Sequence, residues 1–200
     1  TQEQQQLIGN RPVLEFTLRS GNQAFSSFDG RIAITFPYEC QEGELSEEML
    51  VYFLKEDGTL EGVPSSSYNQ EKGEWTFSVS HFSKYGLGHA SNPFGDIIDH
   101  WARPWISYLS TRQIVSGFSP NTFLPDRPLT RAEFAQILMG LEQVVERMGE
   151  ETRQDETSEE KEANLWPFAD GNSEAWYGPA IRWAYDEGLF LGSPGENDTL

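Results

Sequence analysis

The stretch FLPDRPLTRAEFAQILMGL, residues 123–141, contains the clearest helix start in this chain of 200 residues. Thr130 is followed three residues later by Glu133, which is the spacing of a capping box. In that motif the Thr hydroxyl accepts the Glu backbone N–H and the carboxylate accepts the Thr backbone N–H. Apolar residues then recur at helical spacing as far as Met148, so we predict an amphipathic helix over 130–148.

Arg131 lies in the first turn of that predicted helix. A cation there opposes the helix dipole, at a cost of about 0.3–1 kcal/mol. Two partners could compensate. One is a carboxylate of the protein, in a structural ion pair. The other is an anionic ligand, held by the guanidinium together with free backbone N–H groups. The residues alone leave both interpretations open.

Residues 12–90, upstream of the helical region, alternate between apolar and polar side chains. Short alternating runs separated by turn signals such as FDG and EKGE are typical of antiparallel strands. KEDG, between MLVYFL and TLEGV, predicts a hairpin. We therefore predict a small antiparallel β-sandwich over 12–90, preceded by a polar, Gln-rich linker at residues 1–11. The alternating apolar positions are Leu14, Phe16, Leu18, Ile32, Ile34, Phe36, Val51, Phe53, Trp75, Phe77 and Val79.

An internal repeat joins WARPWISYLSTRQIVSG (101–117) to WYGPAIRWAYDEGLFLG (176–192), at an offset of 176 − 101 = 75 residues. Four aligned pairs are identical: Trp101/Trp176, Pro104/Pro179, Ile106/Ile181 and Gly117/Gly192. Such self-similarity predicts repeated units that bury their faces against each other. Between them lies an acidic stretch, residues 142–165. We expect its first part to extend the preceding helix and the rest to be a solvated linker.

The composition excludes several classes of partner. A net charge of −18 argues against nucleic acid and against an anionic membrane surface, because both require a basic face. No apolar run is long enough for membrane insertion, and the one cysteine, Cys40, forms no internal disulfide. The three histidines lack ligand spacing, so we expect no metal and no cofactor. No phosphate loop or paired-carboxylate motif suggests an enzyme.

The tripeptide HFS, residues 81–83, allows two interpretations. It resembles the self-cleavage motif of autoproteolytic β domains, in which Ser83 would attack the Phe82 carbonyl with help from His81. The other interpretation is that these residues close the sandwich.

Residues 94–141 resemble an S-layer homology repeat, on the motifs FGD, HWA, GFSPNTFLPD and TRAEFA. Residues from FAD (168–170) to 200 resemble the first half of a second repeat, which stops before its own TRAE motif. We therefore expect a fragment of a longer protein, with a first repeat over 91–141 and a truncated second one over 166–200. The resemblance implies an α+β fold in two parts. The β-sandwich would come first, and helical repeats forming part of a pseudo-threefold spindle would follow.

The same resemblance implies a function. Such repeats anchor secreted proteins, without a covalent bond, to an anionic and often pyruvylated polysaccharide attached to the peptidoglycan of Gram-positive-type walls. The chain would thus be extracellular, in the cell wall or S-layer. The alternatives are the anchor of a larger surface enzyme, such as a glycoside hydrolase or protease, and a structural S-layer subunit that self-assembles.

The resemblance also assigns roles to particular residues. Arg131 would pair with a sugar carboxylate, and Glu133 would mainly cap the helix and orient its neighbour. Asp96 and Trp101 would shape the groove, which the Gly117 backbone would bring close to the sugar. The counterparts in the second repeat are Asp170, Trp176 and Gly192. A Trp ring could serve as a platform for a sugar or could simply be part of the core.

Overall fold

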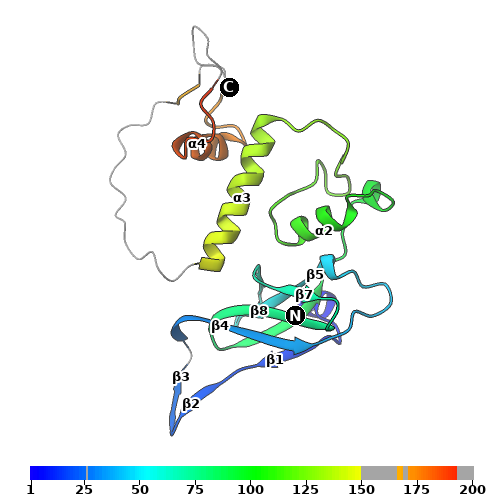
Figure 1. The fold of residues 1–200 in the computed structure, drawn as a ribbon, viewed down its shortest axis with the longest axis vertical. Coiled ribbons are helices and arrows are strands. Elements are labelled where there is room, and N and C mark those ends of the chain that lie inside the picture. The colour runs from blue at the N-terminus through cyan, green and yellow to red at the C-terminus, as the bar shows by residue number, and fades with distance from the viewer. Residues whose placement is uncertain (26, 150–165, 169–170, 193–200) are drawn as a thin grey trace. The chain divides into compact units, whose positions relative to one another are not determined.

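A computed structural model describes residues 1–25, 27–149, 166–168 and 171–192 (Figure 1). These residues form antiparallel sheets and a few helices, so the predicted α+β class is confirmed. They divide into two compact units. One holds residues 1–125 and 147–149, and the other holds residues 126–146 with the described residues beyond 165. The predicted linker at 150–165 lies outside the described residues.

The first unit contains nine strands and two α-helices among its described residues up to 125. The strands form three antiparallel sheets, in the orders β1-β9-β5-β6, β4-β8-β7 and β2-β3. The elements are α1 (Gln2–Leu7), β1 (Val13–Glu15), β2 (Leu18–Ser20), β3 (Gln23–Phe25), β4 (Ser27–Pro37), the 3-10 turn η1 (Ser46–Glu48), β5 (Met49–Leu54), β6 (Leu60–Val63), β7 (Ser67–Asn69), β8 (Glu74–His81), β9 (Lys84–His89), the 3-10 turn η2 (Gly95–Ile97) and α2 (Arg103–Thr111).

The two larger sheets share one hydrophobic core. β8 and β4 supply it from one sheet, and β5 and β9 from the other. Along β8 the side chains alternate between sheet faces, so Trp75, Phe77 and Val79 all point into this core. Burying one such side chain stabilises the fold by roughly 1.5–3 kcal/mol. Five of the predicted apolar positions belong to the buried cluster: Phe36, Val51, Trp75, Phe77 and Val79.

Two of the predicted inward positions are exposed instead. Leu18 lies in the two-stranded β2-β3 ribbon and is 45% exposed. Ile32 follows an irregularity in the β4-β8 register, between Ser27 and Ile32, and is 38% exposed. Ile32 is the first residue of the regular ladder and lies opposite the buried Val79, so its exposure goes with its place beside the irregularity and not with a change of sheet face.

The predicted hairpin at KEDG is confirmed. β5 pairs with β6 in a register that sets Leu54 opposite Leu60. The Lys55 N–H donates to the Thr59 carbonyl at 3.0 Å, and the Asp57 carboxylate accepts the Thr59 N–H at 2.9 Å. Local hydrogen bonds therefore fix this turn and the register of both strands.

The predicted linker at residues 1–11 includes the helix α1, Gln2–Leu7. Thr1 caps this helix, and Gln4 completes a capping box with it. The residue after the helix, Ile8, is 4% exposed and packs onto β9. A β-carbon on Gly86 would lie 2.7 Å from the Ile8 Cδ1 atom. The absence of a side chain at Gly86 therefore leaves space for Ile8 against β9.

The second unit contains α4 (Gly178–Asp186) and, as far as Glu146, α3 (Arg131–Gly149), which confirms the helix predicted over 130–148. Its core includes Ala135 of α3 together with Ala180, Ile181 and Ala184 of α4. The three alanines are fully buried, so the two helices pack through small side chains. Phe168 and Phe190 complete this buried cluster.

The division between the units falls after Pro125, inside the stretch 91–141 that the sequence predicts as the first repeat. η2 and α2 therefore belong with the sheets, and α3 belongs with α4. Among the described residues, no helix is both long and apolar enough to cross a membrane.

Candidate functional site

The TRAE segment begins α3 with the predicted capping box. The Thr130 hydroxyl accepts the Glu133 N–H at 3.2 Å, and the Glu133 carboxylate accepts the Thr130 N–H at 2.9 Å. The second carboxylate oxygen of Glu133 forms a short ion pair with Arg127. Both oxygens of Glu133 therefore have partners within the second unit.

These contacts change the acidity of Glu133. The Thr130 backbone N–H contributes most, followed by the Arg127 guanidinium and the Thr130 hydroxyl. Together they lower the pKa of Glu133 from 4.5 to about 2. Glu133 is therefore a fixed carboxylate of the helix start, as the capping role predicts.

Arg131 is exposed on the first turn of α3. Its guanidinium carbon lies 5.2 Å from the centre of the Phe190 ring, which is a cation–π contact. Within the described part of the chain no carboxylate forms an ion pair with Arg131, and the nearby Glu133 is engaged with Arg127 and Thr130. The described residues thus do not supply the structural ion pair that the sequence allowed.

Asp96 of η2 holds the loop that leads toward the TRAE segment. Its carboxylate accepts the Leu124 N–H at 2.7 Å and the Phe123 N–H at 3.0 Å. These two bonds, that of Leu124 first, lower the pKa of Asp96. Leu124 has a φ of 62°, an unusual value for a leucine, and the bond to Asp96 secures it there. Asp96 therefore has a structural role in the first unit.

Gly117 is required by close packing. A β-carbon at this position would lie 2.4 Å from the Phe94 ring, 2.6 Å from the Ser119 carbonyl oxygen and 2.8 Å from the Thr122 carbonyl oxygen. The glycine also lines a hollow of about 570 Å³ together with Phe118. Its close contacts are with the protein itself.

Trp101 and Trp176, the paired tryptophans of the repeat, are 79% and 64% exposed. The Trp101 ring lies beside His100, with centroids 5.6 Å apart, and Trp176 meets Tyr177 edge to face at 5.5 Å. Neither tryptophan is a core residue, so each presents an aromatic surface to solvent in its own unit.

The repeat predicted from sequence is visible in the helices. α2 and α4 begin 178 − 103 = 75 residues apart and end 186 − 111 = 75 residues apart, and both carry Pro in the first turn. Their C-terminal ends match as well. The Ile114 N–H donates to the Leu109 carbonyl at 2.9 Å, and the Leu189 N–H donates to the Ala184 carbonyl at 2.8 Å.

The residue inside each of these turns has a positive φ. It is 61° at Gln113 in the first repeat and 70° at Gly188 in the second. A glycine is the usual residue in such a helix end. Gly192 also has a positive φ, of 73°, whereas its partner in the alignment, Gly117, does not. The predicted site residue Asp170 lies outside the described residues.

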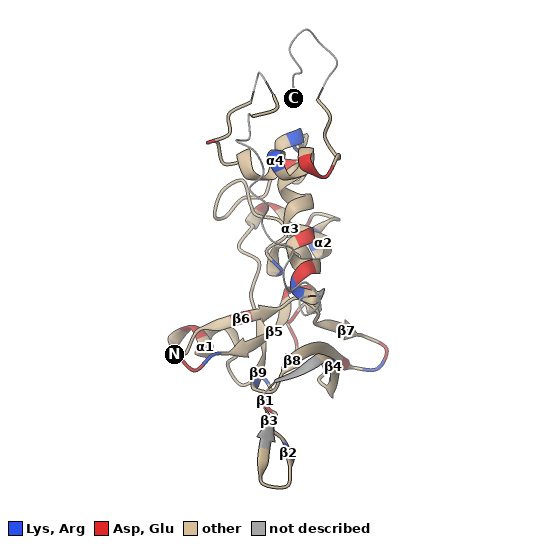
Figure 2. Cartoon of the chain, turned by 90° about the vertical axis from the view of Figure 1, so that its left-hand side faces the viewer, with Lys and Arg blue, Asp and Glu red and all other residues tan. Residues whose placement is uncertain are grey.

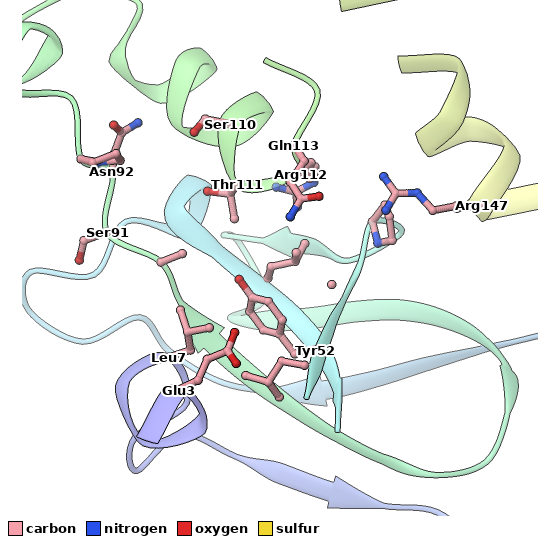
Figure 3. A pocket seen from close by; sticks show the side chains of 16 residues that line it. Glu3, Leu7, Tyr52, Ser91, Asn92, Ser110, Thr111, Arg112, Gln113 and Arg147 are labelled. Atoms are coloured by element: carbon pink, nitrogen blue, oxygen red, sulfur yellow. The ribbon is translucent and has the colours of Figure 1, made fainter. Parts of the chain in front are cut away.

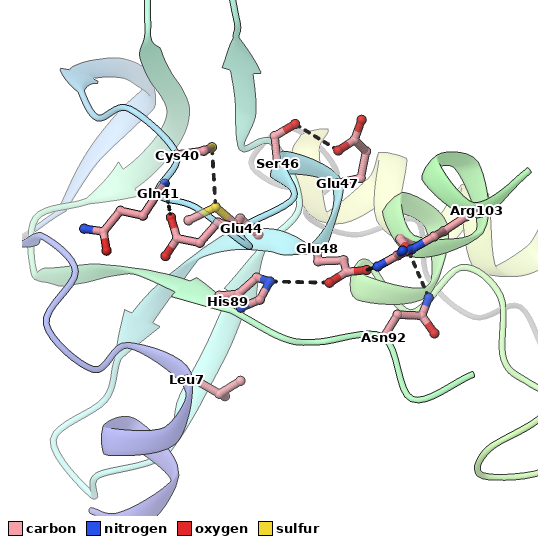
Figure 4. Close-up of polar contacts among 12 residues, drawn as sticks. Leu7, Cys40, Gln41, Glu44, Ser46, Glu47, Glu48, His89, Asn92 and Arg103 are labelled. Atoms are coloured by element: carbon pink, nitrogen blue, oxygen red, sulfur yellow. Dashed lines mark hydrogen bonds and ion pairs between the residues drawn. The ribbon is translucent and has the colours of Figure 1, made fainter. Parts of the chain in front are cut away.

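A buried polar cluster that the sequence analysis missed joins α2 to the sheets (Figure 4). Its centre is Glu48, which is 4% exposed. The carboxylate lies 3.4 Å from the His89 Nε2 atom and 3.4 Å from an Arg103 Nη2 atom, and it accepts the Ser107 hydroxyl at 3.3 Å. Asn92 donates to the same hydroxyl at 3.0 Å. In a chain with so many acidic residues, nothing in the sequence distinguishes Glu48 from the others.

Arg112, just after α2, makes a second link between the same elements. It is 4% exposed, donates to the Ser66 carbonyl at 2.7 Å and lies 3.6 Å over the Tyr108 ring. Burial lowers the pKa of this guanidinium. Arg112 also lines a cavity of about 330 Å³ beside Tyr52 (Figure 3). The helix of the first repeat and the β strands thus share buried contacts within one unit.

The HFS segment lies beside the core that the two larger sheets share. The Tyr85 hydroxyl donates to the His81 carbonyl at 2.9 Å and lies 3.2 Å from the His81 Nε2 atom. The His81 ring also meets Phe53 edge to face at 4.7 Å. These contacts fit the interpretation that HFS closes the sandwich.

Comparison with known proteins gives a family match in two segments. The family of the S-layer homology domain matches residues 93–135 and 167–197. The two segments contain η2, α2, the start of α3 and α4.

Three curated relatives show where similar sequences occur. An amylopullulanase of Thermoanaerobacterium thermosulfurigenes is 27% identical over 171 residues, covering 84% of this chain and 8% of the relative. Exoglucanase XynX of Acetivibrio thermocellus is 32% identical over 107 residues, covering 54% of this chain and 8% of the relative. A cellulosome-anchoring protein of Acetivibrio thermocellus is 40% identical over 50 residues, covering 24% of this chain and 11% of the relative.

The chain therefore spans only about a tenth of the length of these relatives. The amylopullulanase match is longer than the part of the chain that follows residue 92, so it includes residues of the β-rich region. No solved structure matches the chain.

Proposed function

Because this chain carries the S-layer homology domain in two segments and is a cell-surface protein associated with the cell wall, we propose that it is a non-covalent anchor. Its ligand is an anionic, pyruvylated secondary polysaccharide attached to peptidoglycan. The layout that goes with this function is a β-sandwich followed by helical repeats that form part of a pseudo-threefold spindle.

Arg131 is the observation that carries the proposal. Its guanidinium is exposed at a helix N-terminus and has no ion-pair partner among the described residues, while the neighbouring Glu133 is fully engaged. A guanidinium matches a carboxylate in a bidentate geometry, and a charged hydrogen bond contributes about 1.5–3 kcal/mol. A pyruvyl carboxylate would also offset the unfavourable interaction between the cation and the helix dipole.

The other site residues contribute in two ways, by direct contact with the sugar and by holding the backbone in place. Trp101 and Trp176 offer exposed ring faces on which a sugar can stack. Asp96, Gly117 and Glu133 act through the backbone that they hold in place. Asp170 and Gly192 are the counterparts in the second repeat.

The anchored protein can itself be an enzyme. Two relatives are named as an amylopullulanase and an exoglucanase, and each extends far beyond the matched part. The present chain would then be the non-catalytic anchor of a larger surface enzyme, such as a glycoside hydrolase or protease. Self-assembly as a structural S-layer subunit is the competing role, and assembly of the full-length protein into sheets would reveal it.

The test is retention on purified cell-wall sacculi, with and without their secondary polymer. We compare the chain, and a form extended to three repeats, with Arg131→Ala versions of each. Arg182→Ala is the matched control, because it removes the same charge from the same unit at a residue that is paired with Asp186. We expect retention only on polymer-bearing walls, a tenfold or greater weakening by Arg131→Ala, and little effect of Arg182→Ala.

Retention on stripped walls as well would show that the polymer is not the ligand. Equal weakening by both Arg substitutions would show that net charge matters and that Arg131 has no special contact.

A further inference from the structure

A pocket of about 280 Å³ lies in the first unit, between α2 and the sheet that contains β7 and β8. It is separate from the residues proposed to bind the acidic polymer. The residues that matter for its chemistry are Trp105 and Tyr108 of α2, Tyr68 of β7, Ser46 and Glu47 of η1, and Arg112.

The walls of this pocket are aromatic. Trp105 and Tyr108 are three residues apart on α2, so they lie on the same face of the helix, and they are 67% and 39% exposed. Tyr68 stacks on the buried Trp75 with ring centroids 5.2 Å apart, which fixes its position. Flat apolar rings with polar edges suit a ligand that has an apolar face and a rim of polar groups.

The pocket also presents unused hydrogen-bonding groups. One oxygen of Glu47 accepts the Ser46 hydroxyl at 3.0 Å (Figure 4), and the other has no partner among the described residues. The indole N–H of Trp105 likewise forms no hydrogen bond with any residue that the structure describes. Two residues that line the pocket therefore keep an acceptor and a donor for hydroxyl groups.

The charges of the pocket favour a neutral ligand. Glu47 contributes a negative charge and would repel an anion. Arg112 contributes a positive charge and already lies 3.6 Å over the Tyr108 ring, so a quaternary ammonium ligand would meet a cation in the aromatic cage. The two charges cancel, and a molecule without charge is the best match.

We propose that this pocket binds a single neutral sugar ring. The ring stacks its apolar face on Trp105, and its hydroxyl groups donate to the free Glu47 oxygen. The cavity is at the small end of ligand pockets, a size that suits one ring. This site differs from that of Arg131 in its residues, in its unit and in the charge of its ligand.

The test follows the six indole N–H signals of the full chain by nitrogen–proton NMR during titration with a sugar. N-acetylglucosamine represents the glycan strand of peptidoglycan, and glucose represents a neutral hexose polymer. We expect the Trp105 signal, assigned with Trp105→Phe, to shift with a Kd on the order of 1 mM. The sugar that binds more tightly identifies the source of the ligand.

Two variants make the test specific. Trp105→Ala removes the exposed ring and should weaken binding at least tenfold, followed in this variant by the indole N–H signal of Trp75, which also lines the pocket. Phe118→Ala removes an equally exposed aromatic ring of the same unit that does not line the pocket, and should leave the titration unchanged. Because both side chains are exposed, neither substitution should unfold the chain.

No shift of the Trp105 signal with either sugar would overturn the proposal, and so would a shift with choline in place of the sugars. Failure here is distinct from failure of the anchoring proposal. Arg131→Ala should not affect the sugar titration, and Trp105→Ala should not affect the dependence of wall retention on Arg131.

Discussion

Replacing Gly117 with Ala tests whether this glycine serves packing or the ligand. The new β-carbon would lie 2.4 Å from the Phe94 ring, whereas carbon atoms in contact are about 3.5–4.0 Å apart. Phe94 is 6% exposed, so most of its ring is in contact with neighbouring groups. Two carbonyl oxygens, of Ser119 and Thr122, lie within 2.8 Å of the same point.

The magnitude follows from these contacts. Ser119 and Thr122 exchange two backbone hydrogen bonds, at 3.1 and 3.3 Å, which the substitution would disturb. Losing them costs about 1 kcal/mol each. Overpacking around Phe94 adds about 1–3 kcal/mol. Alanine also lowers the conformational entropy of the unfolded chain, which offsets about 0.4–1 kcal/mol of this cost. We expect Gly117→Ala to lower the free energy of unfolding of the first unit by about 3 kcal/mol.

The assay is urea unfolding followed by tryptophan fluorescence, with the midpoint compared at equal slope. Gly95→Ala is the matched control, because a β-carbon there would meet no atom within 4 Å. The control should change the free energy of unfolding by less than about 0.5 kcal/mol. If Gly117→Ala is as stable as the control yet loses retention on polymer-bearing walls, the packing argument is refuted and the glycine serves the sugar.

Three further predictions concern the repeats and their ligand. Gln113→Gly should stabilise the first unit by about 1 kcal/mol in urea unfolding, because it relieves a φ of 61° at the end of α2; a destabilised variant would contradict this explanation. The pKa of Glu133 is about 2 in the folded state and 4.5 otherwise, so its charge stabilises the fold fully above pH 4.5 and less as the pH falls toward 2. Glu133→Gln should therefore destabilise α3 most above that range, and a difference independent of pH would argue against it. Retention on polymer-bearing walls should strengthen with modest salt, because a net charge of −18 repels an anionic polymer over a screening length of about 8–10 Å; a steep loss with salt would show that local attraction dominates.

Screening matters because few arginines remain available to the polymer. The sequence suggests a local basic cluster of Arg103, Arg112, Arg127 and Arg131 that could offset the negative charge. Arg103 instead pairs with Glu48, Arg112 is buried, and Arg127 pairs with Glu133. Acidic residues lie along α3 itself (Figure 2).

Features that depend on neighbours in sequence could be predicted. The capping box of Thr130 and Glu133 needs only a spacing of three residues, and the alternation in β8 needs only a period of two. The repeat was also predictable, because Pro and Trp recur at a fixed offset.

Features that depend on long-range contacts could not be predicted. Glu48 and Arg103 are 55 residues apart, and in an acidic chain a single Glu has no distinguishing mark. α1 was missed because five of its six residues are polar and only Ile8, just beyond it, reaches the core. The aromatic pocket was missed because Tyr68 and Trp105 come from different elements, and their spacing in sequence is not a motif.

The buried contacts of Glu48 and Arg112 have a practical consequence for protein engineering. A fusion that exchanges the wall-binding repeats at the apparent junction near residue 90 would leave Glu48 without Arg103 and Ser107, and would leave the Ser66 carbonyl without Arg112. Losing one partner of a buried ion pair costs about 3–5 kcal/mol. If the β strands and residues 91–125 stay together in a fusion, every one of these contacts is retained. The fusion junction therefore belongs after Pro125, where the first unit's main segment ends.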